Sequence, residues 1–291
     1  MLTRDGCSVC NGPNKNKLQA KQEAIRAAVK WSWDGYKRFA WGSDTLVFCG
    51  ADTDEATPTG LNQISSAAAT LVDSLDVLLL MDFPEEFAEA KAHVETQLVF
   101  DADAFVSTFE YTIRVLGGLL STFALSTDGV FLRKAIELGD SLMPAFTAGE
   151  LPCRMMNLRH GICMAGTAGG GEFQQIDDLR DTSLAEAGTV QMEFRELSRA
   201  SGDPKYERAA TAALRLILRQ AAASPIQFLL PENLYILDAK PKSGDIQVDG
   251  GADSYYECKI LDTAFTRDPH VQPIRVGFFL CFFDEALAPL P

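Results

Sequence analysis

The sequence predicts an all-α fold in which helix–turn–helix units follow one another, as they do in an α/α toroid or solenoid. Apolar residues recur at helical spacing along most of the 291 residues, which is typical of helices with one buried face. An internal repeat with a period of 75 residues is also present: Asp-Gly-Val-Phe at 128–131 with Ala135 resembles Asp-Pro-Lys-Tyr at 203–206 with Ala210. Such a recurring unit favours a toroid or a solenoid, although two copies of so short a pattern can arise by chance.

The individual helices are placed by their periodicity and by the residues that begin and end them. Pro84 suits the first turn of a helix, Pro144 ends one, and Asp203 followed by Pro204 is a helix start. The expected helices are residues 18–41, 65–81, 84 to about 99, 103–124, 129–142, 182–199 and 204 to about 222, with one more beginning near Asp253.

The helix expected at 103–124 shows the clearest periodicity. Its apolar stripe at period 3.6 consists of Phe105, Phe109, Ile113, Leu116, Leu120 and Phe123. Another face carries Glu110, Arg114, Gly117 and Ser121. Residues 1–17 are polar and are expected to be disordered.

Two further segments are expected to be non-helical. Residues 147–180 read as a loop that is rich in glycine at 169–171. Residues 226–250 read as extended chain with a turn near 242–244, which predicts a short β-hairpin-like segment.

The composition excludes several classes of protein. Hydrophobic residues make up 47% and charged residues 23% of the chain, which is typical of a globular protein with one large or two small domains. The net charge of −14 disfavours nucleic-acid binding, because an acidic surface repels phosphate backbones. No apolar stretch approaches the roughly 20 residues of a membrane span, since the longest, 276–283, is too short. No signal peptide is visible, so we expect synthesis in the cytosol unless the true N-terminus lies further upstream.

The seven cysteines are odd in number and widely spaced, which does not indicate a disulfide scaffold. Cys7 and Cys10 form one CxxC with no second pair nearby. Free thiols near the N-terminus explain this better than a zinc site does.

Several acidic residues are candidates for chemistry, and each has a plainer reading. Glu110 and Arg114 lie one helical turn apart. They are either a surface ion pair or an acid beside a guanidinium in a pocket lined by small residues. Asp253 is a helix cap or a carboxylate at a helix start beside two tyrosines. Glu186 and Glu193 lie seven residues apart on one expected helix, and a solvated helix face explains this spacing as well as a role in chemistry does. Asp73 and Asp76 read as a cap and a surface charge.

Other enzyme classes lack their motifs. The sequence has no P-loop, GxGxxG, HExxH or GxSxG, and its three histidines are scattered. Two separated carboxylates in an α/α frame point instead to glycoside hydrolysis.

Eight segments, taken together and in order, resemble one family. They are AWGSD at 40–44, LVDSLDVL at 71–78, FEYTIRVLGGLLS at 109–121, MPAF at 143–146, NL at 157–158, EF at 193–194, GDPKY at 202–206 and DSYYE at 253–257. Over residues 22–257 the chain is similar to the class I α-1,2-mannosidases, glycoside hydrolase family 47. The shared order is far more specific than any single motif.

The resemblance implies an (α/α)7 barrel that removes α-1,2-linked mannose from high-mannose N-glycans, with inversion and with bound Ca2+, in the endoplasmic reticulum or Golgi. It implies that Glu110 is the general acid, acting through water, and that Asp253 is a further catalytic carboxylate. The implied substrate-binding residues are Arg114, which orients Glu110, and Glu186, Asn157 and Glu257. An inverting mechanism places its carboxylates about 6.5–9.5 Å apart.

The sequence also departs from the family pattern. Residues 18–257 read as a partial catalytic domain and 258–291 as a tail unlike the family, so the barrel is expected to be incomplete. The later catalytic carboxylates and the threonine that holds Ca2+ have no counterpart, and no metal ligand is assigned. Gly251 stands where the family often has Arg or Leu, which leaves branch preference open. We therefore expect a catalytically incomplete α-1,2-mannosidase; the alternative is a non-catalytic glycan-binding or regulatory protein.

Overall fold

The structure is a computed structural model that describes residues 15–47, 58–64, 66–147, 150–164, 181–226, 228–242, 244 and 246–258. The expectations for residues 1–14, for the glycine-rich stretch 169–171 and for residues 259–291 fall outside these ranges. Residues 15–17 are helical rather than disordered, because the first helix begins at Lys15.

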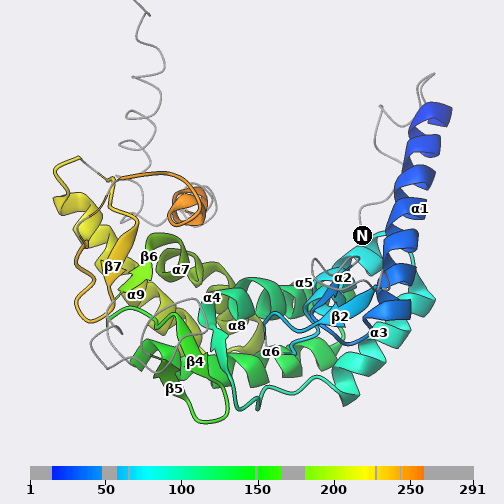
Figure 1. The fold of residues 1–291 in the computed structure, drawn as a ribbon, viewed down its shortest axis with the longest axis horizontal. Helices are drawn as coiled ribbons and strands as arrows, with labels where there is room; N and C mark the ends of the chain where they lie inside the picture. Colours follow the sequence, from blue (N-terminus) through cyan, green and yellow to red (C-terminus); the bar gives the residue numbers. More distant parts are fainter. Residues whose placement is uncertain are drawn as a thin grey trace, which may run out of the picture.

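The described helices follow one another around an open arc, with α1 at one end and α9 near the other (Figure 1). The longer helices are α1 (Lys15–Phe39), α2 (Ala69–Leu80), α3 (Pro84–Thr96), α5 (Gly117–Ser126), α6 (Gly129–Leu142), α8 (Gln191–Ser201) and α9 (Lys205–Ala223). Consecutive helices pack as the hairpins α2/α3, α5/α6 and α8/α9, and α5 also contacts α2 and α8. The all-α prediction is confirmed.

The predicted repeat corresponds to equivalent positions in two successive hairpins. Asp128 Oδ1 accepts a hydrogen bond from the backbone N–H of Val130 at 3.0 Å. Asp203 Oδ1 accepts one in the same way from Lys205 at 3.0 Å. The aromatic residue that follows each cap is buried in the core. The repeat therefore marks two equivalent turns, each with an aspartate that accepts a backbone hydrogen bond and an aromatic residue buried in the core.

The segment 103–124 is not one helix, contrary to the prediction. It contains β3 (Phe105–Ser107), α4 (Thr108–Glu110), the π-helix η3 (Tyr111–Leu116) and α5. Ser107 interrupts the pattern because its side chain caps α4, while β3 pairs with a distant strand. The π-helix also rotates the buried face, which consists of Tyr111, Thr112, Val115 and Leu116. Of the predicted stripe, Leu116 and Leu120 are fully buried, whereas the remaining members are only partly buried.

The segment 182–199 departs from the prediction in the same way. It begins with β6 (Asp181–Ser183), continues as α7 (Leu184–Thr189) and then becomes α8. Ser183 and Glu186 form a capping box, with each side chain bound to the other residue's backbone N–H. Both interrupted segments thus carry a Ser-x-x-Glu signature, which is the sequence sign of a helix start.

Short antiparallel strands join the helices. β3, β4 (Met155–Asn157) and β5 (Ile162–Met164) form one sheet, so the predicted loop 147–180 contains two strands. β1 (Thr45–Val47) pairs with β2 (Thr59–Leu61), and β6 pairs with β7 (Asn233–Tyr235).

The extended segment at 226–250 contains a hairpin. Leu234 bridges Pro241 in antiparallel fashion across a turn at 236–238, and Ser243 of the predicted turn lies outside the described residues. The main partner of β7 is β6, which lies far away in the sequence.

Two apolar clusters form the core, one under α2, α5, α6 and α8, and the other between α7, α9 and the helix at 253–258. None of the helices in the described part of the chain is both long and apolar enough to cross a membrane.

Candidate functional site

Glu110 lies at the junction of α4 and η3, where the local sequence fixes its backbone. Its N–H donates to Ser107 Oγ at 3.2 Å. Arg114 Nε donates to Glu110 Oε2 at 2.5 Å, and Arg114 Nη1 lies 3.7 Å from Asp73 Oδ2 on α2. The predicted Glu110–Arg114 pair is therefore present, and a second carboxylate from another helix joins it.

These three side chains line a cavity of about 320 Å³ between α2 and η3. The lining residues are Asp44, Thr45, Gln63, Ile64, Ala69, Thr70, Asp73, Glu110 and Arg114. Most of them are polar, which suits a ligand that carries many hydroxyl groups.

The charges in this cavity influence one another. Partial burial raises the pKa of Asp73, and the nearby guanidinium of Arg114 opposes that rise. The hydrogen bond to Glu110 raises the pKa of Arg114, so the guanidinium stays charged. Asp73 is neither a cap nor an isolated surface charge, because it lies within α2 and faces Arg114. Asp76 also has a partner, since its Oδ2 accepts a hydrogen bond from Ser121 Oγ at 2.7 Å.

Asp44 connects several backbone segments at the cavity through hydrogen bonds. It is 2% exposed, and its Oδ2 accepts hydrogen bonds from the N–H groups of Ile64 at 2.9 Å and Ser66 at 3.0 Å. Its Oδ1 accepts from the N–H of Ala69 at 3.3 Å, where α2 begins without a side-chain cap of its own. Asp44 thereby supplies the missing cap and fixes the helix that carries Asp73.

Glu186 is the counterpart of Glu110 one unit later in the chain. It follows Ser183 as Glu110 follows Ser107, and α7, which carries it, contacts α4. Arg154 Nε lies 2.7 Å from Glu186 Oε2, so each glutamate is paired with an arginine. This geometry differs from a solvated helix face, and Arg154 was not indicated by the motifs.

Glu193 is also not on a solvated face. Its Oε2 is buried without a hydrogen-bond partner among the described residues, and burial raises its pKa to about 7. Gly117 lies beside it, since a Cβ at that position would make an ordinary contact with Glu193 Cγ at 3.8 Å.

Asp253 begins the helix at 253–258, and its Oδ1 accepts a hydrogen bond from the N–H of Ser254 at 2.7 Å. The hydroxyl of Thr189 lies 2.9 Å from that of Ser254, which places this helix beside the end of α7. Tyr255 and Tyr256 are buried against each other in the core, so they do not form an exposed sugar platform.

The remaining predicted residues lie elsewhere. Asn157 is 6% exposed; its Nδ2 donates to Asp103 at 2.9 Å and its Oδ1 accepts from the N–H of His160 at 3.1 Å. Glu257 is exposed on the helix at 253–258. Substrate binding by either residue stays a prediction.

The described residues offer no group of three or more His, Cys, Asp and Glu side chains that would hold a metal ion. Bound Ca2+ therefore stays a prediction, and no chemical step is assigned to it.

The Ser-x-x-Glu signature would have located both glutamates at helix starts. Asp44 and Arg154 have no such local signal, because their partners lie far away in the sequence.

Comparison with known proteins agrees with this fold. Residues 28–273 match glycosyl hydrolase family 47. The mannosyl-oligosaccharide 1,2-alpha-mannosidase MNS1 of Arabidopsis thaliana is 36% identical over 239 residues, which are 81% of this chain and 39% of that protein. The endoplasmic reticulum mannosyl-oligosaccharide 1,2-alpha-mannosidase of Homo sapiens is 38% identical over 193 residues, 66% of this chain and 25% of that protein. The chain thus spans about two fifths or less of the length of these relatives.

Among solved structures, an alpha-1,2-mannosidase from Trichoderma reesei matches with a TM-score of 0.73 at 22% identity, covering 88% of this chain and 53% of that one. This likeness confirms the expected fold class, an (α/α)7 barrel of which the described helices form an open arc. Because the family match covers most of the sequence, the chain belongs to glycosyl hydrolase family 47.

Proposed function

We propose that this chain carries the acid side of an α-1,2-mannosidase site and binds terminal α-1,2-linked mannose of high-mannose N-glycans. The observation that supports this is the Glu110–Arg114–Asp73 array in a polar cavity. Relatives from plant and human are named mannosyl-oligosaccharide 1,2-alpha-mannosidases.

The geometry suggests a role for each group. Arg114 holds Oε2 of Glu110, so Oε1 is the oxygen that can deliver a proton, through a water molecule, to the leaving glycosidic oxygen. In the inverting mechanism a second carboxylate activates water on the opposite face of the sugar, and Asp253 is our candidate for a carboxylate at the ring. Glu186 would bind sugar hydroxyls beside them.

The alternative is glycan binding without turnover. The open arc favours this alternative for the described part of the chain (Figure 1), because a closed barrel would surround the sugar with groups from all sides. We expect the chain by itself to bind without releasing mannose.

The deciding experiment measures mannose release and calorimetric binding on the same high-mannose glycan, with and without Ca2+. Glu110→Gln keeps the shape of the side chain but removes the acid, and Glu95→Gln removes an exposed carboxylate that is paired with Arg133. Release that is lost in Glu110→Gln by about 10²–10⁴-fold, but kept in Glu95→Gln, would establish the acid and disprove our expectation of inactivity. Binding without release is the result that we expect, and for this chain it would favour glycan binding without turnover over an active acid. A folded chain that shows neither would refute the proposal.

We also propose that the protein resides in the endoplasmic reticulum or Golgi. One relative is named for the endoplasmic reticulum, and a disulfide joins Cys153 to Cys163. Disulfides persist in oxidising compartments of this kind. Fractionation that found the protein only in the cytosol would contradict this location.

A further inference from the structure

Arg154 contacts both α4, which carries Glu110, and α7, which carries Glu186. The N–H of Thr108, the first residue of α4, donates to the backbone oxygen of Arg154 at 2.8 Å. The side chain of Arg154 binds Glu186 on α7 at 2.7 Å. One residue outside the cavity is therefore in contact with the start of α4, which leads to Glu110, and with Glu186 itself.

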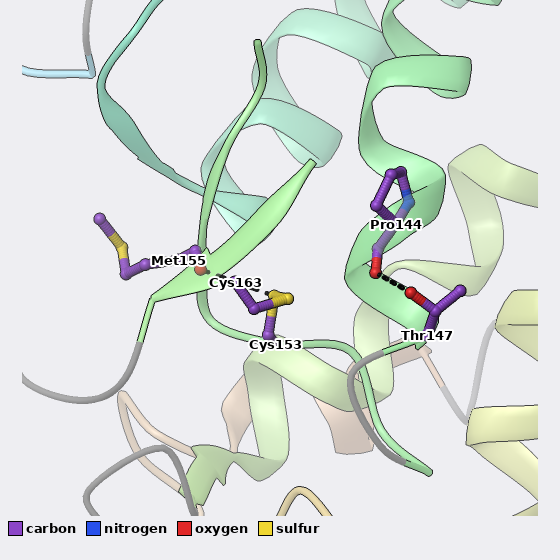
Figure 2. Close-up of a disulfide and its surroundings, with 5 residues drawn as sticks. All are labelled: Pro144, Thr147, Cys153, Met155 and Cys163. Atoms are coloured by element: carbon purple, nitrogen blue, oxygen red, sulfur yellow. Dashed lines mark hydrogen bonds between the residues drawn. A yellow bond between two sulfur atoms is a disulfide. The ribbon is translucent and has the colours of Figure 1, made fainter. Parts of the chain in front are cut away.

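The backbone of Arg154 is fixed on both sides. Its neighbour Cys153 is 1% exposed, donates its N–H to the oxygen of Ala145 at 3.0 Å, and forms the disulfide with Cys163. Figure 2 shows this disulfide at the β4–β5 hairpin, with Pro144 and Thr147 on the neighbouring turn. On the other side, β4 pairs with β3, where Ser107 lies opposite Met155.

These connections matter because neither ion pair is well shielded from water. The side chain of Arg154 is 33% exposed and that of Glu186 is 20% exposed, so their attraction is too weak to hold an orientation unless the backbone beneath is rigid. Ser107, which caps Glu110, lies on the strand that the disulfide-linked hairpin supports. The hairpin is therefore connected to both glutamates, through strand pairing and the cap on one side and the ion pair on the other.

We propose that Arg154 is a positioning residue, and that the Cys153–Cys163 disulfide makes it one by clamping the β4–β5 hairpin against α4 and α7. When the disulfide is reduced, two thiols form at the expense of an added dithiol, which becomes a cyclic disulfide. The hairpin then loosens locally, and the alignment of Glu110 and Glu186 is lost. The link to the sugar site rests on the proposed function, whereas the link to the two helix starts does not.

The test is amide hydrogen exchange of the whole chain, oxidised and after reduction with dithiothreitol under native conditions. Closing a loop with a sequence separation of 10 limits local opening, and its release should speed exchange at Thr108 and Glu110 about tenfold to a hundredfold. Exchange in α6 and α9 should stay the same. Cys153→Ser/Cys163→Ser should show the fast exchange from the start, with no further response to dithiothreitol, which controls for the other cysteines.

A second variant separates the backbone from the side chain. Arg154→Gln keeps the carbonyl oxygen that binds Thr108, so exchange at Thr108 should remain slow while glycan binding falls at least about threefold. Arg154→Lys keeps the charge and should recover part of that binding.

Unchanged exchange at Thr108 and Glu110 on reduction would overturn the clamp. So would faster exchange everywhere, which would make the disulfide a general stabiliser of the fold. If the wild-type chain binds no glycan, the proposed function fails, and the exchange data still decide whether the clamp exists.

Discussion

Burial of the Glu193 carboxyl group should make the free energy of unfolding depend on pH by an amount that follows from its pKa. Burial raises its pKa from an ordinary value of 4.5 to about 7. A difference of that size corresponds to about 3 kcal/mol, at about 1.4 kcal/mol for each pH unit. Because the folded-state pKa is the higher one, the folded chain holds the proton more tightly than the unfolded chain. The associated stability is fully present below pH 4.5 and is lost as the pH rises to about 7.

Glu193→Gln removes this titration while keeping the shape of the side chain. We expect the variant to gain about 3 kcal/mol relative to wild type between pH 4.5 and 7, with no further change above that range. Urea unfolding at half-unit pH steps measures the difference directly. Glu196→Gln on the same helix is the matched control, because Glu196 lies at the surface, paired with Arg199, and its stability curve should run parallel to wild type.

A stability difference that does not depend on pH would contradict the burial of Glu193. If the difference between wild type and Glu193→Gln does not change from pH 4 to pH 8, then Glu193 ionises in the folded chain as easily as in the unfolded chain. Its carboxylate would then be solvated or paired, contrary to the buried and unpartnered Oε2.

Two further predictions concern packing and capping. A Cβ at Gly118 would lie 2.9 Å from the backbone oxygen of Val72, so Gly118→Ala should destabilise the α2–α5 contact by about 1–3 kcal/mol in urea unfolding. Gly250→Ala is the control, because a Cβ there meets no atom within 4 Å, and it should cost less than about 0.5 kcal/mol. Equal losses in the two variants would contradict the close approach of α5 to α2. Asp128→Ala and Asp203→Ala should each cost about 1 kcal/mol, since both carboxylates cap at 3.0 Å; a measurable loss in only one of them would show that the two caps are not equivalent.

Local signals predicted the helices well where no strand interrupts them. The helix expected at 129–142 is α6 with the same bounds, and Pro84 begins α3 as predicted. At Ser107 and Ser183 a serine caps a new helix after a short strand, and the apolar periodicity continues across the junction. The periodicity alone therefore predicted one continuous helix at each place. The strands themselves have no strong local pattern, because each is three residues long and is defined by a distant partner.

The candidate site also combines features with a local sequence signal and features that depend on distant segments. The chain's residues alone were enough to predict the all-α class, the repeating hairpin, the family motifs and the pairing of Glu110 with Arg114, because all of these depend on residues close together in the chain or on shared motif order. Folding was needed to bring Asp73 to Arg114, to place Arg154 on Glu186 and to bury Glu193. Those contacts depend on how α2, the β4–β5 hairpin and α8 pack around the arc, and packing between distant segments has no periodicity that a single sequence can reveal.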